Sequence, residues 1–208
     1  MPSDILRPRS ALSSPEVVYA VTGKEAMDGG EQRDSRLEVE EAISDFFETA
    51  WEEERREDRD LTYLPTLPDL TYRIMDHLKL TGKERLLDLG SGSGMFVIAA
   101  STRVQESVGY ELKETRHKRA LRYLAKLAER GPVDPKKIRL ERGNFLQVDF
   151  SGYDLIFLFS GAVEGIEEEA LFNRLAGQMR MGARLIVRAM DNPIFDTEGR
   201  HSLCAKVS

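Results

Sequence analysis

The chain has 208 residues and a formal net charge of −6, with 41% hydrophobic and 32% charged residues. This size and composition predict a globular protein with one main domain and a substantial core. No apolar run approaches the ~20 residues that cross a bilayer. The first ten residues, MPSDILRPRS, lack the apolar stretch of a secretory signal, so we expect a cytoplasmic protein that does not enter membranes. A single cysteine and three scattered histidines exclude an internal disulfide and predict that no metal is bound.

The first 60 residues predict two parts that precede the main domain. Residues 1–33 contain Pro, Ser and Gly without periodicity, which is typical of a flexible arm. Residues 34–60 predict an amphipathic helix, because Ser35-Arg-Leu-Glu38 matches a capping box and apolar residues follow at helical spacing. The stripe within 35–57 includes two Phe and a Trp, which would aggregate if exposed. We expect it to cover the chain's own core, or alternatively a partner in a homo- or hetero-oligomer.

Residues 61–208 predict one α/β domain, since strand and helix patterns alternate along it. After the proline-punctuated segment 61–68 and a helix, the pattern predicts strands at 84–89, 106–111, 137–142, 153–159 and 183–190, and helices at 94–103, 113–130 and 166–179. This alternation implies a doubly wound, mostly parallel, Rossmann-like sheet with both faces covered. Beyond residue 190 we expect a loop and at most one strand, so the C-terminal part of the sheet is shortened.

The chemistry is concentrated where the first of these strands meets its helix. The loop Gly90-Ser-Gly-Ser-Gly94 forms a turn that a ligand can approach closely, because glycine has no Cβ. The ligand-binding residues predicted in this loop are Gly90, Ser91, Gly92 and Gly94. Glu111 ends the next strand, where a carboxylate can accept hydrogen bonds from both ribose hydroxyls of an adenosine-type ligand. Asp88 precedes the loop, where it suits an ammonium group and opposes a diphosphate. The spacing is not the G-x-G-x-x-G of dinucleotide enzymes, and no P-loop signature is present. A sulfonium cofactor with a free amino group fits best.

These motifs resemble those of the class I, seven-strand, Rossmann-like methyltransferases that depend on S-adenosylmethionine. Asp88-Leu-Gly-Ser-Gly-Ser-Gly94 is similar to the first motif of that superfamily, and Gly109-Tyr-Glu111 to the second. Gly143-Asn-Phe145 resembles the place where the superfamily holds the adenine, which implies that Asn144 and Phe145 contact the cofactor; they could instead be a turn and a core residue. The resemblance implies S-adenosyl-L-methionine as cofactor.

A narrower resemblance is to the small lysine methyltransferases related to the disruptor-of-telomeric-silencing histone enzymes. It rests on Tyr63-Leu-Pro-Thr66 together with Arg142-Gly-Asn-Phe-Leu-Gln-Val-Asp149. In that group the Tyr-x-Pro-Thr segment closes over the cofactor, which implies that Tyr63 and Thr66 belong to the cofactor pocket. An ordinary connector is the alternative interpretation of this segment.

The methyl acceptor is predicted less sharply than the cofactor. Ser160-Gly161 stands where base-modifying relatives carry Asn-Pro-Pro-Tyr or Asp-Pro-Pro-Tyr, which argues against methylation of exocyclic base amines. Ser160 is a candidate for lining the site of the methyl acceptor. The sequence assigns a catalytic role to no residue. Our leading hypothesis is a protein substrate methylated on lysine. An RNA or small-molecule methyltransferase is the alternative within enzymes, supported by the basic stretch 113–142, and a non-catalytic methyltransferase-like binding subunit is the alternative outside them.

Overall fold

The computed structural model describes residues 16–20, 35–57, 63–159, 162, 168–188 and 204–205. Its helices are α1 (Ser35–Glu57), α2 (Pro68–Leu78), α3 (Met95–Ala100), α4 (Glu114–Arg130) and α5 (Glu168–Gln178). Its strands are β1 (Glu16–Ala20), β2 (Arg85–Leu89), β3 (Glu106–Glu111), β4 (Ile138–Arg142), β5 (Leu155–Phe159), β6 (Arg184–Arg188) and β7 (Cys204–Ala205). Every helix and strand expected between residues 34 and 190 is confirmed. Among the helices of these ranges, none is long and apolar enough to cross a membrane.

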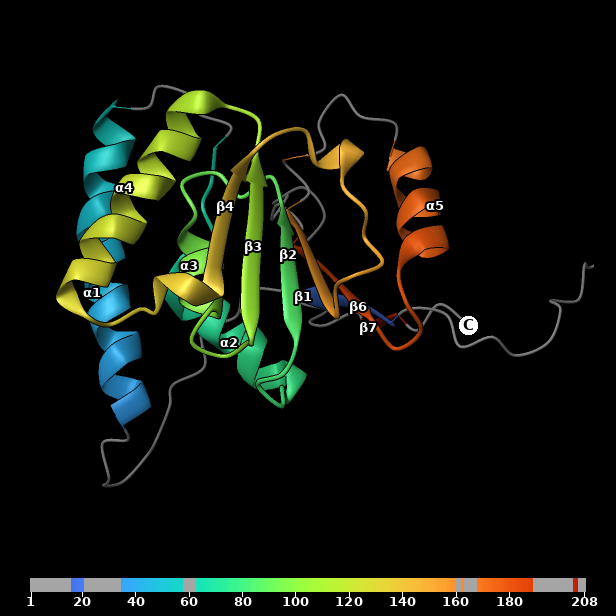
Figure 1. The fold of residues 1–208 in the computed structure, drawn as a ribbon, viewed down its shortest axis with the longest axis horizontal. Helices are drawn as coiled ribbons and strands as arrows, with labels where there is room; N and C mark the ends of the chain where they lie inside the picture. The colour runs from blue at the N-terminus through green and yellow to red at the C-terminus, as the bar shows by residue number, and fades with distance from the viewer. Residues whose placement is uncertain are drawn as a thin grey trace, which may run out of the picture.

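The strands form one sheet in the order β4-β3-β2-β5-β6-β1-β7 (Figure 1). Strands β4, β3, β2, β5 and β6 run parallel, which confirms the predicted doubly wound α/β fold. The chain moves outward from β2 to β4 and then returns to place β5 on the other side of β2. The order in which strands are added to the sheet therefore reverses between β2 and β5. At such a switch point a crevice for a ligand is expected at the carboxyl ends of the strands.

The structure corrects the prediction of a flexible arm over residues 16–20. These residues form β1, which pairs in parallel with β6 in the register Val18↔Ile186. The segment Glu-Val-Val-Tyr-Ala is rich in residues that favour strands, but it is short and its neighbours show no alternation, so the pattern was missed. The rest of the 1–33 arm lies outside the described residues. β7 pairs antiparallel with β1, in agreement with the single strand expected near the C-terminus.

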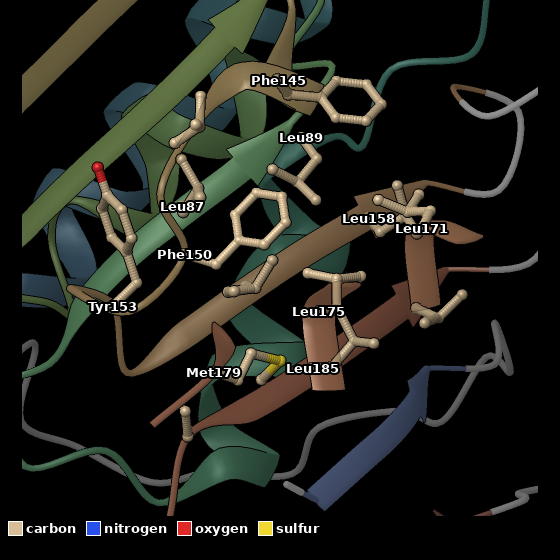
Figure 2. Packing of buried hydrophobic residues seen from close by; sticks show 14 of the residues in the cluster. Leu87, Leu89, Phe145, Phe150, Tyr153, Leu158, Leu171, Leu175, Met179 and Leu185 are labelled. Atoms are coloured by element: carbon tan, nitrogen blue, oxygen red, sulfur yellow. The ribbon is translucent and has the colours of Figure 1, made fainter. Parts of the chain in front are cut away.

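Helices cover both faces of the sheet, α1 to α4 on one side and α5 on the other (Figure 1). Alternate strand residues explain this, because successive side chains point to opposite faces. Leu87 and Leu89 of β2 pack with Leu171 and Leu175 of α5 and with Phe150 from the connection before β5 (Figure 2). The opposite-facing residues of the same strands pack against α2 and α3. Both faces are therefore buried, as a parallel sheet requires.

The apolar stripe of α1 is covered by the chain itself. Ile43 and Phe47 are fully buried against α3 and α4. The rings of Phe46, Phe47 and Tyr123 meet edge to face, with centroids 5.2–5.7 Å apart. The predicted stripe thus finds its cover within the domain, and its burial does not require a partner chain.

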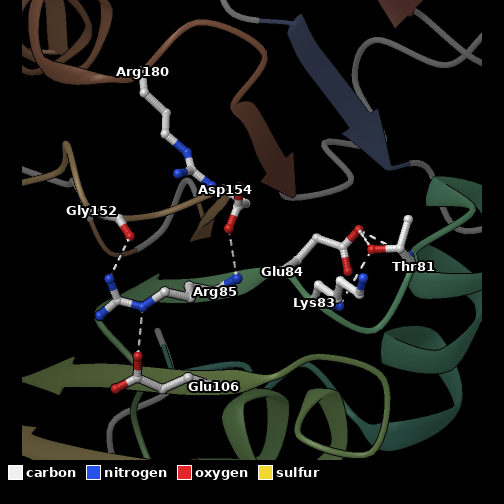
Figure 3. Close-up of polar contacts among 8 residues, drawn as sticks. All are labelled: Thr81, Lys83, Glu84, Arg85, Glu106, Gly152, Asp154 and Arg180. Atoms are coloured by element: carbon white, nitrogen blue, oxygen red, sulfur yellow. Dashed lines mark hydrogen bonds and ion pairs between the residues drawn. The ribbon is translucent and has the colours of Figure 1, made fainter.

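Polar contacts tie together the amino-terminal edge of the parallel strands (Figure 3). The Arg85 N–H donates to Asp154 Oδ2 at 2.8 Å, and its guanidinium donates to Glu106 Oε2 at 2.7 Å and to the Gly152 carbonyl at 2.9 Å. Arg180 forms an ion pair with the same Asp154. This edge is closed by protein groups, so the opposite, carboxyl edge is the one left for a ligand.

Candidate functional site

The glycine loop is held against the carboxyl end of β3 by two backbone hydrogen bonds. The N–H groups of Gly90 and Ser91 both donate to the Tyr110 carbonyl, at 3.0 and 2.9 Å. Gly92 and Gly94 have φ of +56° and +79°, the left-handed region that glycine occupies without strain. Gly94 directly precedes α3, so the loop turns at once from strand into helix.

The absence of a side chain at Gly92 lets the segment 63–66 approach the loop. A Cβ at Gly92 would stand 2.5 Å from the Tyr63 hydroxyl oxygen, which is closer than real Cβ contacts. That hydroxyl accepts the Ser93 N–H at 2.8 Å and shares a second hydrogen bond of 2.8 Å with Ser93 Oγ. The Tyr63 phenol is fixed on the loop, and burial raises its pKa above the usual range, so it stays neutral.

We predict that Gly92→Ala displaces Tyr63 and weakens binding of S-adenosylhomocysteine, the demethylated donor, about fivefold, because the new methyl group and Tyr63 compete for one place. Isothermal titration calorimetry measures the effect. Gly131→Ala is the matched control, since Gly131 also has positive φ but a Cβ there meets nothing within 4 Å. The control should lose thermal stability and keep its affinity. Equal losses of affinity in both variants would contradict the close-approach argument.

Glu111 is buried at the end of β3 and is fixed by two backbone donors. Its Oε2 accepts the Gly92 N–H at 2.8 Å, and its Oε1 accepts the Lys113 N–H at 2.7 Å. Only 6% of the residue is exposed. Each carboxylate oxygen retains a second lone pair, so the group is oriented and can still accept hydrogen bonds from a ligand.

Asp88, in β2, is the second carboxylate of the site and is 3% exposed. Burial, followed by the negative charge of Glu111, raises the pKa of its carboxyl well above the usual value. Within the part of the chain that the structure describes, no hydrogen bond to this carboxyl group is found. A buried carboxylate in such surroundings is costly unless a cation or a hydrogen-bond donor arrives. The position therefore suits a positively charged ligand group.

The segment 63–66 is anchored from a second side by β6. Arg188 Nη1 donates to the Pro65 carbonyl and to Thr66 Oγ1, both at 3.1 Å. The Arg116 guanidinium lies 4.0 Å from the centre of the Tyr63 ring, and the Trp51 ring meets the same ring edge-on at 6.2 Å. Residues from α1, α4 and β6 thus hold one short connector over the glycine loop.

These groups enclose a cavity of about 480 Å³, within the range of roughly 300–1,000 Å³ that is common for small-molecule sites. It is lined by the predicted residues Tyr63, Thr66, Asp88, Gly90, Ser91, Glu111, Asn144 and Phe145. Gly92 and Gly94 do not line it: the Gly92 N–H donates to Glu111, and Gly94 is the N-cap residue just before α3. Ser160 lies outside the described residues.

Asn144 has a local role that the sequence left open. Its Oδ1 accepts the Leu146 N–H at 2.9 Å and so caps the short 3-10 turn Phe145–Gln147. Asn144 is therefore a turn residue that also lines the cavity, and Phe145 is a mostly buried residue that does the same.

Several lining residues were missed by sequence reasoning, namely Leu64, Pro65, Met95, Phe96, Leu112, Lys113, Arg116, Leu146, Phe157, Phe159 and Ala162. Two signals could have found some of them. Arg116 lies in the first turn of the helix after Glu111, and Phe157 shares its face of the sheet with Asp88, its register partner. Across the described ranges, no group of three or more His, Cys, Asp or Glu side chains is arranged to hold a metal ion.

Comparison with known proteins agrees with this geometry. A family model described as "Histone methylation protein DOT1" matches residues 56–156. A protein-lysine N-methyltransferase from Saccharolobus islandicus is 26% identical over 126 residues, which are 60% of this chain and 73% of that protein. The crystal structure of an RNA methyltransferase from Salinibacter ruber in complex with S-adenosyl-L-homocysteine superposes with a TM-score of 0.50 and 24% identity. It covers 60% of this chain and 76% of that one, and this likeness supports the fold.

A doubly wound sheet with a glycine loop, two buried carboxylates and a cavity at its carboxyl edge defines a Rossmann-like enzyme that binds an adenosine-type cofactor. The matching family model, the lysine methyltransferase relative and the fold together support an S-adenosylmethionine-dependent methyltransferase of the class I, Rossmann-like superfamily.

Proposed function

We propose that this methyltransferase modifies lysine side chains of a protein. The observation that carries the proposal is the contact between the segment 63–66 and the glycine loop through Tyr63 and Ser93. This segment has the Tyr-x-Pro-Thr pattern of the small lysine methyltransferases, and it falls inside the region that matches the DOT1 family model. The Saccharolobus islandicus relative, named a protein-lysine N-methyltransferase, supports the same substrate class.

The residues of the cavity fit S-adenosylmethionine in charge and in shape. We assign Asp88 to the amino group of the cofactor, since this buried carboxyl would gain a cationic partner. We assign Glu111 to the ribose hydroxyls, because its carboxylate is already oriented by Gly92 and Lys113. Asn144 and Phe145 would contact the adenine, and Tyr63 and Thr66 would cover the cofactor. When bound, the cofactor supplies an electrophilic methyl group on a sulfonium whose leaving group is a neutral thioether.

The chain's own contribution to the reaction is to align the methyl donor with the acceptor and to place apolar side chains beside the acceptor. Alignment of the two reactants alone can contribute on the order of 7–11 kcal/mol. A lysine amine, with an ordinary pKa of about 10.4, must lose its proton before it can attack a methyl group. The rings of Phe157 and Phe159 line the cavity and would disfavour the charged ammonium by desolvation.

Arg188 adds an electrostatic reason for the loss of this proton. Its guanidinium lies 4.8 Å from the centre of the Phe159 ring, beside the same wall of the cavity. A positive charge there disfavours a second cation and so lowers the pKa of an incoming amine. Besides Asp88 and Glu111, no carboxylate lines the cavity within the described ranges. We therefore propose that desolvation by the cavity wall favours release of the proton.

The basic stretch 113–142 gives less support to an RNA substrate than its composition suggested. Arg119 is bonded to the buried Glu54 at 2.8 Å, and Lys118 and Arg142 both pair with Glu114, at 2.7 and 3.1 Å. Bases that are already neutralised by neighbouring carboxylates release fewer counterions on a phosphate backbone and contribute less to binding it.

The substrate class is tested with a radiolabelled methyl donor. The protein is incubated with labelled S-adenosylmethionine and cell extract, and the products are digested separately with protease and ribonuclease. We expect protease alone to release the label and amino-acid analysis to recover it as methylated lysine. Label released by ribonuclease, or recovered on another amino acid, would contradict the proposal.

A further inference from the structure

A groove of about 1120 Å³ runs between α1 and α2, on the outer side of the connector that covers the cofactor cavity. We propose that this groove binds a lysine- and arginine-rich segment of the protein substrate, in an extended conformation. The inference rests on the proposed function, because it names the surface by which that function would select its substrate.

Negative charge dominates the groove. Seven carboxylates line it against three guanidinium groups, and on α1 they follow one stripe at intervals of four, three and four residues: Glu41, Asp45, Glu48 and Glu52. This spacing keeps them on one face of the helix. Asp69 and Asp76 of α2 stand opposite.

Two of the three guanidinium groups in the groove, those of Arg103 and Arg36, lie on Glu40 and not on the exposed stripe. Arg103 is held by Glu40, at 2.5 and 2.8 Å, and by Asp76 at 2.7 Å. Arg36 lies 3.7 Å from the same Glu40. By contrast, the described residues include no ion-pair or hydrogen-bond partner for the carboxylates of Asp45 and Glu48, which are both exposed. A cationic side chain would find these two groups available.

A second feature of the groove, independent of its charge, points to a ligand. Tyr72 lines the groove and is only 8% exposed, and among the residues that the structure describes its hydroxyl has no hydrogen-bond partner. Burial and the nearby charge of Glu40 raise the pKa of this phenol, so it remains a neutral donor. A buried hydroxyl without a partner is costly, and this oxygen is covered in the free protein, so we propose that a small shift of the groove wall on binding lets a peptide carbonyl accept its hydrogen bond.

The dimensions and the apolar surfaces of the groove fit a short extended peptide. From Glu41 to Glu52 the α1 stripe spans about 16 Å, at 1.5 Å per helical residue. Roughly five residues of extended chain cover that length, at about 3.3 Å each. Trp51 and the partly exposed Leu37 and Leu67 offer apolar contact to the aliphatic stems of lysine and arginine.

The groove also lies next to the methyl-transfer site. Residues 64–66 line the cofactor cavity, and the next residues, Leu67, Pro68 and Asp69, line the groove. Trp51, in the groove wall, touches the Tyr63 ring that covers the cavity. A peptide in the groove would therefore lie along the connector that closes over the cofactor. An acidic groove repels nucleic acid, so the charge favours a basic peptide over RNA.

The experiment compares a double charge reversal with a matched control. Asp45→Lys/Glu48→Lys alters the groove, and Glu53→Lys/Glu129→Lys makes the same change in net charge at exposed helix positions that do not line it. The probe is a fluorescein-labelled nine-residue peptide of alternating alanine and lysine, followed by fluorescence anisotropy. We expect the groove variant to bind at least about tenfold more weakly, the control to bind like the unaltered protein, and both to keep their affinity for S-adenosylhomocysteine.

A third variant tests the hydroxyl without a change of charge. Tyr72→Phe should raise the melting temperature of the free protein, because it removes the unsatisfied group, and should weaken peptide binding about threefold. Peptide binding as tight as that of the unaltered protein would contradict the role given to Tyr72.

The remaining outcomes separate this inference from the proposed function. A peptide that binds in the groove without being methylated would support the groove and contradict lysine methylation. Methylation of the peptide with the same KM in the groove variant and the unaltered protein would contradict the proposal for the groove and still support lysine methylation. Displacement of the peptide by an oligouridylate, or a change in the sedimentation coefficient of the protein alone on charge reversal, would overturn the proposal in favour of RNA or of a second copy of the chain.

Discussion

Glu111→Ala is expected to lower the affinity for S-adenosylhomocysteine about 100-fold. The substitution removes the acceptor assigned to two ribose hydroxyls, and hydrogen bonds to a charged group are worth about 1.5–3 kcal/mol each. It also leaves the Gly92 and Lys113 N–H groups without their acceptor, so the loop and the turn into α4 lose their common anchor. Isothermal titration calorimetry measures the affinity.

Two further variants serve as a graded substitution and as a control for Glu111→Ala. Glu111→Gln keeps one oxygen acceptor but presents an NH₂ group to a backbone donor, so we expect an intermediate loss of affinity. Glu129→Ala, at an exposed position on α4, should change nothing. If Glu111→Ala bound the ligand as tightly as the unaltered protein, the assignment of Glu111 to the ribose would be wrong.

Asp88→Asn is expected to stabilise the free protein and to weaken cofactor binding at the same time. Burial and Glu111 raise the pKa of Asp88 in the folded state, so ionised Asp88 opposes folding at neutral pH. We expect the neutral amide to increase the free energy of unfolding by about 1 kcal/mol and to lower cofactor affinity at least about tenfold, because a charge-assisted hydrogen bond to the amino group is lost. Thermal melts and calorimetry measure the two effects.

The raised pKa of Asp88 also predicts how the stability and the cofactor affinity change with pH. A carboxyl whose folded-state pKa is raised contributes stability below its unfolded pKa of about 3.9 and loses that contribution as the pH rises through the raised value. The stability advantage of Asp88→Asn should therefore vanish at acid pH and be largest near neutrality. The affinity of the unaltered protein should fall as the pH drops through the raised pKa, and Asp88→Asn should lack this dependence. Asp134→Asn is the control, since an exposed carboxylate that caps a 3-10 turn is replaced by an equally good cap.

The parallel sheet and the glycine loop could be predicted because they depend on local patterns. Apolar strand patterns that alternate with helical patterns predicted a parallel α/β sheet, and Gly90 to Gly94 marked the turn where the ligand-binding edge begins. β1 was missed because a five-residue strand is recognised by its pairing with β6, and its own sequence shows no alternation.

The rest of the site depends on contacts between distant residues, which no local pattern reports. Arg188 reaches Thr66 across 122 positions of the chain, and Tyr63 reaches Ser93 across 30. The groove depends on the way α1 packs beside α2, although the acidic stripe that lines it is visible in the sequence of α1. Asn144 was predicted as a cavity residue, yet only the structure shows that its side chain also caps the following turn.

A crystal structure of the protein with S-adenosylhomocysteine tests the assignment of the cavity most directly. We expect the ligand to fill the cavity at the carboxyl edge of the sheet, with its amino group within hydrogen-bond distance of the Asp88 carboxylate and both ribose hydroxyls on Glu111. A cavity that stays empty at saturating ligand, or a ligand bound with neither carboxylate in contact, would contradict it.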